Sequence, residues 1–180
     1  RRREHAGSAL FVGDAALEHR VTRTVAGAIK HANAELLSKT SMLEARLIAG
    51  DKELFAEFRG EFLRHCVEGH EEEYIRERVA NQAEWHEKFG HTAYMQEPNL
   101  KNGCGGLRDY QNLLWMAWFK FGTRTLEEIE KRGAITAGER KQLVAAYDFI
   151  LRVRHELHYQ VNRPVDALSK NLQPPVALKL

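Results

Sequence analysis

Apolar residues recur about every three to four positions along most of this chain, and that spacing predicts α-helices. Residues 52–67 carry such an apolar stripe, made of Leu54, Phe55, Phe58 and Phe62. A second helix is predicted from the glutamates at 71–73 to Gly90, because carboxylates stabilise the positive end of a helix dipole. Residues 107–121 are apolar nearly all round, which predicts a central helix covered by its neighbours.

The last long helix is predicted over residues 137–162, and it ends before Pro164 because the residue preceding a proline avoids the helical region. Its predicted inward face consists of Leu143, Tyr147, Ile150, Leu151, Leu157 and Val161. Helix starts are marked by three capping-box spacings, in which a hydroxyl and a glutamate three residues later cap each other's backbone amides. These are Ser41 with Glu44, Thr125 with Glu128, and Thr136 with Glu139.

Two further features complete the predicted elements. Gly50 and Asp51 look like the end of one helix and the cap of the next, so a helix is expected from Ser41 to Gly50. Strand character is confined to residues 10–12 and 20–24, near the start of the chain. The predicted fold class is therefore mainly α, a helical bundle with a small β remnant at the N-terminus.

Composition narrows the class of protein. The 180 residues are 43% apolar and 29% charged, which is typical of a folded globular chain and excludes disorder as the main state. The longest apolar stretch, residues 113–119, is far shorter than the roughly 20 residues that a bilayer-spanning helix needs. Cys66 and Cys104 are too few for a disulfide framework and no secretory signal is visible, so we expect a cytoplasmic protein.

The ends of the chain indicate a fragment of a longer protein, because it opens without Met and stops inside an apolar pattern at residues 176–180. The net charge of +2 is too small to suggest binding to nucleic acid. Residues 1–100 carry 14 Lys and Arg against 17 Asp and Glu, whereas residues 101–180 carry 13 against 8. The basic second part either meets a phosphate-bearing ligand or is a solvated surface.

One segment does not resemble ordinary packing. Residues 97–109 read Glu-Pro-Asn-Leu-Lys-Asn-Gly-Cys-Gly-Gly-Leu-Arg-Asp and lie between two predicted helices. Gly105 and Gly106 stand where the central helix begins, and free amides at a helix start can bind an anion. Lys101 and Arg108 would add positive charge. The alternative is a tight glycine turn with Asp109 stabilising the helix dipole, and the segment is neither a Walker loop nor a dinucleotide fingerprint.

Arg154 is the second unusual position, because it lies on the apolar face of the last predicted helix. A charge there must be paired with a carboxylate such as Asp109 or Glu97, or must meet a nucleotide phosphate. The histidines suggest zinc only weakly, since the second His of His155-Glu-Leu-His158 is one position short of the zinc motif. No nucleophile with an attached base is evident.

The segment at 97–109 resembles the Glu-Pro-Asn-Ile-Lys-x-Gly-x-Gly-Gly-Leu-Arg-Asp signature of the bacterial PII-protein uridylyltransferase / uridylyl-removing enzymes. The similarity covers about residues 10–180, nearly the whole chain. Cys104 stands where proline is common and Tyr110 where isoleucine is common. Further matching positions are His19, Val21, Arg23, Thr24, residues 43–51, Gln111, Leu114, Trp115, Phe121, Gly122, residues 125–128, residues 151–155, Leu157, His158 and Arg163.

The resemblance implies a nucleotidyltransferase domain followed by a helical domain, an HD hydrolase domain and ACT regulatory domains. It implies transfer of UMP from UTP to a tyrosine of the PII nitrogen-regulatory protein, with release of pyrophosphate, and removal of the same group under control by glutamine. Residues 1–40 would end the nucleotidyltransferase domain and its sheet, and residues 41–180 would form the helical domain beside the active site. We expect the isolated fragment to be inactive.

The resemblance also implies Mg²⁺, because nucleotidyl transfer uses a carboxylate-held divalent metal to stabilise charge on the triphosphate. Most of its ligands would lie upstream of this chain. Aligning on His19 puts Val12 where a third family carboxylate is expected, and Asp14, two residues away, is the metal candidate. The triphosphate candidates are Lys101, Gly105, Gly106, Arg108 and Arg154.

Two other interpretations stay open. The chain could be a non-catalytic helical module of a degenerate family member that only binds a protein such as PII, or a plain helical scaffold. The sequence also does not separate uridylyl from adenylyl transfer.

Overall fold

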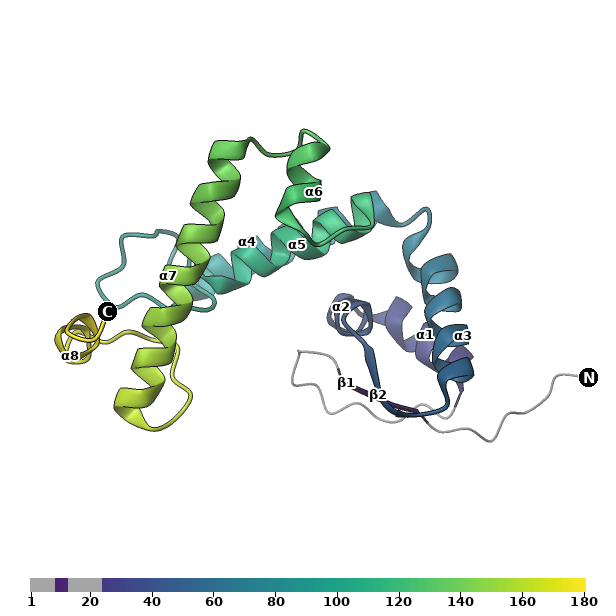
Figure 1. Cartoon of the computed structure of the whole chain (residues 1–180), viewed down its shortest axis with the longest axis horizontal. Helices are drawn as coiled ribbons and strands as arrows, with labels where there is room; N and C mark the ends of the chain where they lie inside the picture. The colour runs from purple at the N-terminus through teal and green to yellow at the C-terminus, as the bar shows by residue number, and fades with distance from the viewer. Residues whose placement is uncertain (1–8, 13–23) are drawn as a thin grey trace, which may run out of the picture. The chain divides into compact units, whose positions relative to one another are not determined.

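The computed structural model describes residues 9–12 and 24–180. The chain divides into two compact units, Arg1–Tyr74 and Ile75–Leu180, and each is described by itself (Figure 1). Both are built mainly of helices, which confirms the predicted fold class. The predicted domain boundary after residue 40 falls inside the first unit and stays a prediction about domain origin.

Among its described residues, the first unit contains a two-stranded sheet, three helices and a π-helical turn, η1. Two of the helices begin at side-chain caps: the Thr24 hydroxyl accepts from the Gly27 amide, and the Asp51 carboxylate accepts from the amides of Glu53 and Leu54. The cap predicted at Asp51 is therefore confirmed. The elements are β1 (Ala9–Val12), α1 (Val25–Ala34), α2 (Leu36–Leu43), β2 (Arg46–Gly50), α3 (Lys52–Phe62) and η1 (Leu63–Val67), and α4 (Glu71–Phe89) begins here.

The sheet of the first unit departs from the sequence prediction. Strand β1 confirms the strand expected at residues 10–12, and it pairs antiparallel with β2, with Ala9 opposite Gly50. The helix expected from Ser41 to Gly50 is wrong, because Ser41 is buried inside α2 and β2 follows. Pairing with a distant strand outweighed the local capping signal. The other predicted strand lies outside the described residues, apart from Thr24.

The core of the first unit forms where α1, α2, α3 and η1 meet. Phe62 and Cys66 are fully buried there, and the rings of Phe58 and Phe62 lie tilted against each other with centroids 6.0 Å apart. The hydroxyls of Thr40 and Tyr74 hydrogen-bond at 2.9 Å inside this core. Burial raises the pKa of the Cys66 thiol, with a smaller opposing effect of Lys39. This cysteine is therefore a packing residue in its neutral form.

The second unit is formed by most of α4 and by α5 (Leu107–Phe121), α6 (Leu126–Lys131), α7 (Ala137–Val161) and α8 (Gln173–Ala177). Thr136 and Glu139 make the complete predicted capping box at the start of α7. Thr125 caps the Glu128 amide, whereas the Glu128 carboxylate binds Lys131. Helix α7 ends with Asn162 in the left-handed conformation (φ 50°), just before the predicted stop at Pro164.

Helix α5 lies against both α6 and α7 (Figure 1). Lys120 is its only exposed residue, so the prediction of a central helix is confirmed. One apolar cluster joins α5 and α6 around Ala117, Leu126 and Ile129. A second cluster joins α7 and α8 to the preceding loops and contains Leu100, Val153, Leu157 and Val176.

On α7, Leu157 is buried as predicted, and the sequence reading missed Val153. The other predicted inward residues of α7 are half-buried. Tyr147 is one of them, and its ring stacks on that of Tyr110 from α5, with the centroids 4.2 Å apart. None of the described helices combines the length and apolar character that crossing a membrane requires.

Candidate functional site

The segment at 97–109 forms a compact turn that leads into α5. The side-chain oxygen Oδ1 of Asn99 accepts from the amides of Lys101 (3.1 Å) and Asn102 (2.7 Å), and the Asn99 carbonyl accepts from Gly103 (3.0 Å). An asparagine that caps the next residues in this way mimics a backbone turn. The turn therefore begins at Asn99, and this residue fixes its first part.

The glycines of the turn are required by close backbone contacts and by conformation. A Cβ on Gly103 would lie 2.7 Å from the Asn99 carbonyl oxygen. A Cβ on Gly106 would lie between 2.9 and 3.0 Å from three carbonyl oxygens, those of Gly103, Lys101 and Leu100. Gly105 has open space around it but a φ of +75°, which favours glycine. All three glycines are thus explained by the fold of the turn.

The prediction that this turn offers free amides is wrong. The Gly105 amide donates to Oδ2 of Asp109 (2.8 Å), and the Gly106 amide donates to the Gly103 carbonyl (2.9 Å). The first amides of α5 donate backwards into the turn, from Leu107 to the carbonyl of Leu100 (3.0 Å) and from Arg108 to that of Lys101 (2.8 Å). Carbonyl oxygens of the turn and the Asp109 carboxylate therefore occupy the positions where an anion would bind. An anion at this place would therefore have to be bound by side chains of the turn.

Two cationic side chains lie on the turn. Lys101 is half-buried and forms no ion pair within residues 9–12 and 24–180. The guanidinium carbon of Arg108 lies 5.7 Å from the centre of the Trp115 ring, in the range of a cation–π contact. Both side chains therefore hold positive charge at the start of α5, as the sequence predicted. Their binding of a phosphate stays a prediction.

Arg154 has a carboxylate partner, though not either of those named from the sequence. Its Nε lies 2.7 Å from Oδ1 of Asp166, and both side chains are half-buried. Asp109 and Glu97, the suggested partners, are engaged elsewhere: Asp109 binds the turn, and Glu97 accepts from the Lys170 amide (2.8 Å). This pairing neutralises Arg154 and favours the structural interpretation of that residue.

The segment after α7 holds the turn from its other side. The Leu100 amide donates to the Asp166 carbonyl (2.7 Å), and the Leu168 amide donates to the Pro98 carbonyl (3.0 Å). A single β-bridge joins Asn99 to Ala167. Arg154, by pairing with Asp166, therefore fixes the strand-like segment to which the turn is hydrogen-bonded.

A row of polar contacts between α4 and α5 was not anticipated from the sequence. Arg78 donates to Asn112, and Gln82 and His86 both bind Asp109. The guanidinium of Arg78 also lies 4.7 Å from the centre of the Trp115 ring. The residues on α4 are four apart, which places them on one face. The four-residue spacing of these polar side chains was the signal in the sequence for a polar face on α4.

The described residues do not form a magnesium site. No group of three or more His, Cys, Asp or Glu residues within 9–12 and 24–180 could hold a metal ion. The Asp109 oxygens are already occupied by hydrogen-bond donors, so they do not suit a divalent cation. Asp14 lies outside the described residues. The Mg²⁺ expected from the sequence therefore stays a proposal for other parts of the protein.

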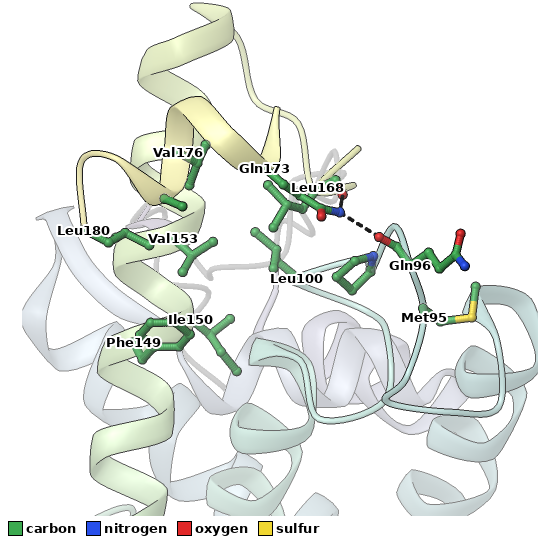
Figure 2. Close-up of a pocket in the computed structure, with 12 residues that line it drawn as sticks. Met95, Gln96, Leu100, Phe149, Ile150, Val153, Leu168, Gln173, Val176 and Leu180 are labelled. Atoms are coloured by element: carbon green, nitrogen blue, oxygen red, sulfur yellow. Dashed lines mark hydrogen bonds between the residues drawn. The ribbon is translucent and has the colours of Figure 1, made fainter. Parts of the chain in front are cut away.

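A cavity of about 410 Å³ lies next to the turn but has different chemistry. Leu100, Phe149, Val153 and Val176 are among its mostly apolar lining, which Figure 2 shows as sticks. Gln173 reaches across its rim and donates to the Gln96 carbonyl (2.6 Å). None of the five residues predicted to bind phosphate lines it, so we do not assign the triphosphate to this cavity.

Comparison with known proteins assigns the chain to a family. The family model described as GlnD PII-uridylyltransferase matches residues 73–180, which include the turn, α5 and α7. The chain belongs to the PII-uridylyltransferase family. The resemblance carried by the sequence signature is thereby confirmed.

Relatives in this family are named bifunctional uridylyltransferase/uridylyl-removing enzymes. Those from Rhodopseudomonas palustris and Bradyrhizobium sp. strain ORS 278 are 35% and 36% identical to the chain, and that from Rhodospirillum rubrum is 33% identical. Each match spans 159 residues, which is 88% of this chain and 17% of the relative's length. The chain thus spans about a sixth of these relatives. No solved structure matches it.

Proposed function

We propose that this chain is part of a PII uridylyltransferase, which transfers UMP from UTP to a tyrosine of the PII nitrogen-regulatory protein and also removes it. The chain would supply the helical domain beside the active site. The membership of the family supports the reaction class, and PII and UTP follow as partner and substrate. The reaction uses the nucleotide pool of the cytoplasm, where we place the enzyme.

Lys101 carries this proposal most directly. A half-buried lysine that forms no ion pair within the described residues is available to an anionic ligand. Arg108 follows seven residues later on the same turn, and an arginine can bind two phosphate oxygens at once. Together they suit the triphosphate of UTP. Arg154 is the weakest of the proposed cations because Asp166 already neutralises it.

The proposed role of the turn is electrostatic. UMP transfer breaks the bond between the α- and β-phosphates, and negative charge accumulates on the departing pyrophosphate. Fixed cations that face this charge stabilise the transition state. A Mg²⁺ ion held by carboxylates elsewhere in the protein would supply Lewis-acid stabilisation of the same phosphates. Gly105 and Gly106 shape the turn, since their amides are occupied within it.

The proposal is tested by steady-state kinetics of PII uridylylation in the full-length protein. We expect Lys101→Ala and Arg108→Ala each to raise the KM for UTP or lower kcat by about tenfold, the usual cost of losing a charged hydrogen bond. Arg108→Lys should recover part of the loss. Lys141→Ala, which removes an exposed lysine of α7, is the control. Unchanged kinetics in both alanine variants would remove the turn from the nucleotide site.

The internally bonded amides favour a second candidate function, a non-catalytic helical module that binds PII. In that case the turn is only a structural joint between α5 and the segment at 166–170. Calorimetry with PII and with UTP separates the two functions. The module binds PII and yields no labelled PII with either radiolabelled UTP or ATP, whereas the enzyme yields labelled PII. The same assay identifies the transferred nucleotide.

A further inference from the structure

Asp109 links the face of α4 to the turn. Its oxygen Oδ1 accepts from Nε2 of Gln82 (2.6 Å) and lies 3.0 Å from Nε2 of His86. Its oxygen Oδ2 accepts from the Gly105 amide (2.8 Å) and lies 3.1 Å from the same histidine nitrogen. A carboxylate can only accept, so Nε2 of His86 carries the proton. Both oxygens are therefore fixed by donors on two sides.

The amide that Asp109 binds belongs to the most conformationally demanding residue of the turn. Gly105 has a φ of +75°, a conformation that favours glycine. The hydrogen bond from its amide to Asp109 restrains it in that conformation. Lys101 and Arg108 lie on either side of this glycine and are joined to each other through the Arg108 amide and the Lys101 carbonyl (2.8 Å).

We propose that His86 is a positioning residue: by holding Asp109 against α4, it fixes the Gly105 turn and thereby the relative placement of Lys101 and Arg108. His86 lies at a contact between helices and has no part in the proposed binding of phosphate. The geometry of the turn stands independently of the proposed function, whereas the effect on UTP rests on it. Gln82 assists from one turn earlier on α4.

The first test is hydrogen–deuterium exchange of the peptide covering residues 99–109 in the full-length protein. His86→Ala should increase its exchange rate by about tenfold, because the restraint on Asp109 is halved. His86→Gln should restore the slow rate, since glutamine can place an N–H donor near the position of Nε2. His70→Ala is the matched control: His70 also pairs with a carboxylate, Glu73, at 3.1 Å, but it precedes α4 and is not among the donors that bind Asp109. It should leave exchange at 99–109 unchanged.

The second test compares KM with kcat for UTP in the same variants. A positioning role predicts that His86→Ala raises the KM for UTP, as Lys101→Ala is expected to do. It also predicts that His86→Gln reverses this increase. Unchanged exchange at residues 99–109 in His86→Ala overturns the proposal. Faster exchange with an unchanged KM also overturns it, provided that Lys101→Ala raises KM.

The two proposals fail in different ways. If neither Lys101→Ala nor Arg108→Ala affects UTP kinetics, the turn is not a nucleotide site, and the exchange measurement alone decides the role of His86. If both affect the kinetics and His86→Ala leaves both exchange and KM as they were, the nucleotide site survives and the positioning role is rejected. A general loss of folding in His86→Ala would appear as faster exchange throughout α5 and α7, and His86→Gln then serves as the test variant.

Discussion

Arg154 and Asp166 form a half-buried ion pair, with Nε and Oδ1 2.7 Å apart, across the junction between α7 and the segment that holds the candidate turn. The same aspartate accepts the Leu100 amide with its main-chain carbonyl (2.7 Å). One residue therefore connects a helix to the turn through both its side chain and its backbone. Its displacement would disturb the turn on the side opposite to Asp109.

Removing this ion pair should destabilise the second unit. We expect Arg154→Ala to lower the free energy of unfolding by about 1–2 kcal/mol, because a half-buried charged hydrogen bond is lost and Asp166 is left with the longer contact to His158, at 3.9 Å. Urea denaturation of the chain measures the change, and a double-mutant cycle with Asp166→Asn isolates the coupling. Arg152→Ala is the control, since both its pair with Asp148 (3.8 Å) and its hydrogen bond to the Leu180 carbonyl (3.0 Å) are exposed. Equal losses in both variants would contradict the expectation.

The glycines of the turn should respond differently to alanine. Gly106→Ala places a Cβ within 3.0 Å of three carbonyl oxygens, and we expect a loss of about 2–3 kcal/mol because backbone atoms cannot move aside independently. Gly105→Ala meets no atoms but must adopt a positive φ, at a cost of about 1–2 kcal/mol. Thermal or urea denaturation ranks the two variants. A loss at Gly105 that exceeds the loss at Gly106 would argue against the described packing.

Gly60 gives the control for that series. It lies inside α3, has no positive φ, and a Cβ there would meet nothing within 4 Å. Gly60→Ala should therefore stabilise the chain by about 0.5–1 kcal/mol, since alanine favours the helix and restricts the unfolded state.

The buried contact between Arg78 and Asn112 should be costly to break. Their exposed fractions are 2% and 1%, and Arg78 donates to Oδ1 of Asn112 while lying over the Trp115 ring. We expect Asn112→Ala to lower the free energy of unfolding by about 2–3 kcal/mol, because a buried guanidinium loses an acceptor. Asn112→Asp keeps an acceptor of the same shape and should cost less. Urea denaturation distinguishes the two, and an aspartate variant that loses more than alanine would refute this account.

The capping box of α7 predicts a pH effect. Hydrogen bonds from the Thr136 amide and hydroxyl lower the pKa of the Glu139 carboxyl from its ordinary value of 4.5. A carboxyl with a lowered pKa in the folded state stabilises the fold above its unfolded pKa, and this contribution is lost as pH falls through the folded value. The chain should therefore melt higher than Glu139→Gln at pH 7, and the difference in Tm should shrink as pH falls below the ordinary value of 4.5. A difference in Tm that is constant with pH would exclude this contribution.

Local signals in the sequence were sufficient for the long helices. Residues 107–121 form α5 with the predicted bounds. A helix that is apolar nearly all round has to be buried by its neighbours, and this stretch shows that pattern along its own length. The Thr136 box predicted the start of α7 correctly, since its two partners are only three residues apart. By contrast, Ser41 and Glu44 have the same spacing and lie at the end of a helix, because β2 is determined by a strand some 35 residues earlier.

In the candidate site, too, the features set by neighbouring residues were predicted and those set by distant contacts were not. The sequence identified the turn, its glycines and its cations, since these lie together within residues 97–109. It wrongly predicted free amides at the start of α5. Whether such amides are free depends on where the carbonyl groups of the preceding residues lie after folding. It also missed the partner of Arg154 and the contact of His86 with Asp109. Both contacts join separate elements, and the four-residue spacing on α4 indicates a shared helix face without identifying what that face meets.

The cysteines give each compact unit its own reporter. Cys66 is fully buried in the core of the first unit with a raised thiol pKa, whereas Cys104 lies half-buried in the turn of the second, with its Sγ 3.4 Å from the Gly90 carbonyl. A thiol reagent therefore modifies Cys104 during small openings of the turn and reaches Cys66 only when the first core comes apart. Timed alkylation followed by mass spectrometry can thus follow the unfolding of both halves in one sample, without any introduced label.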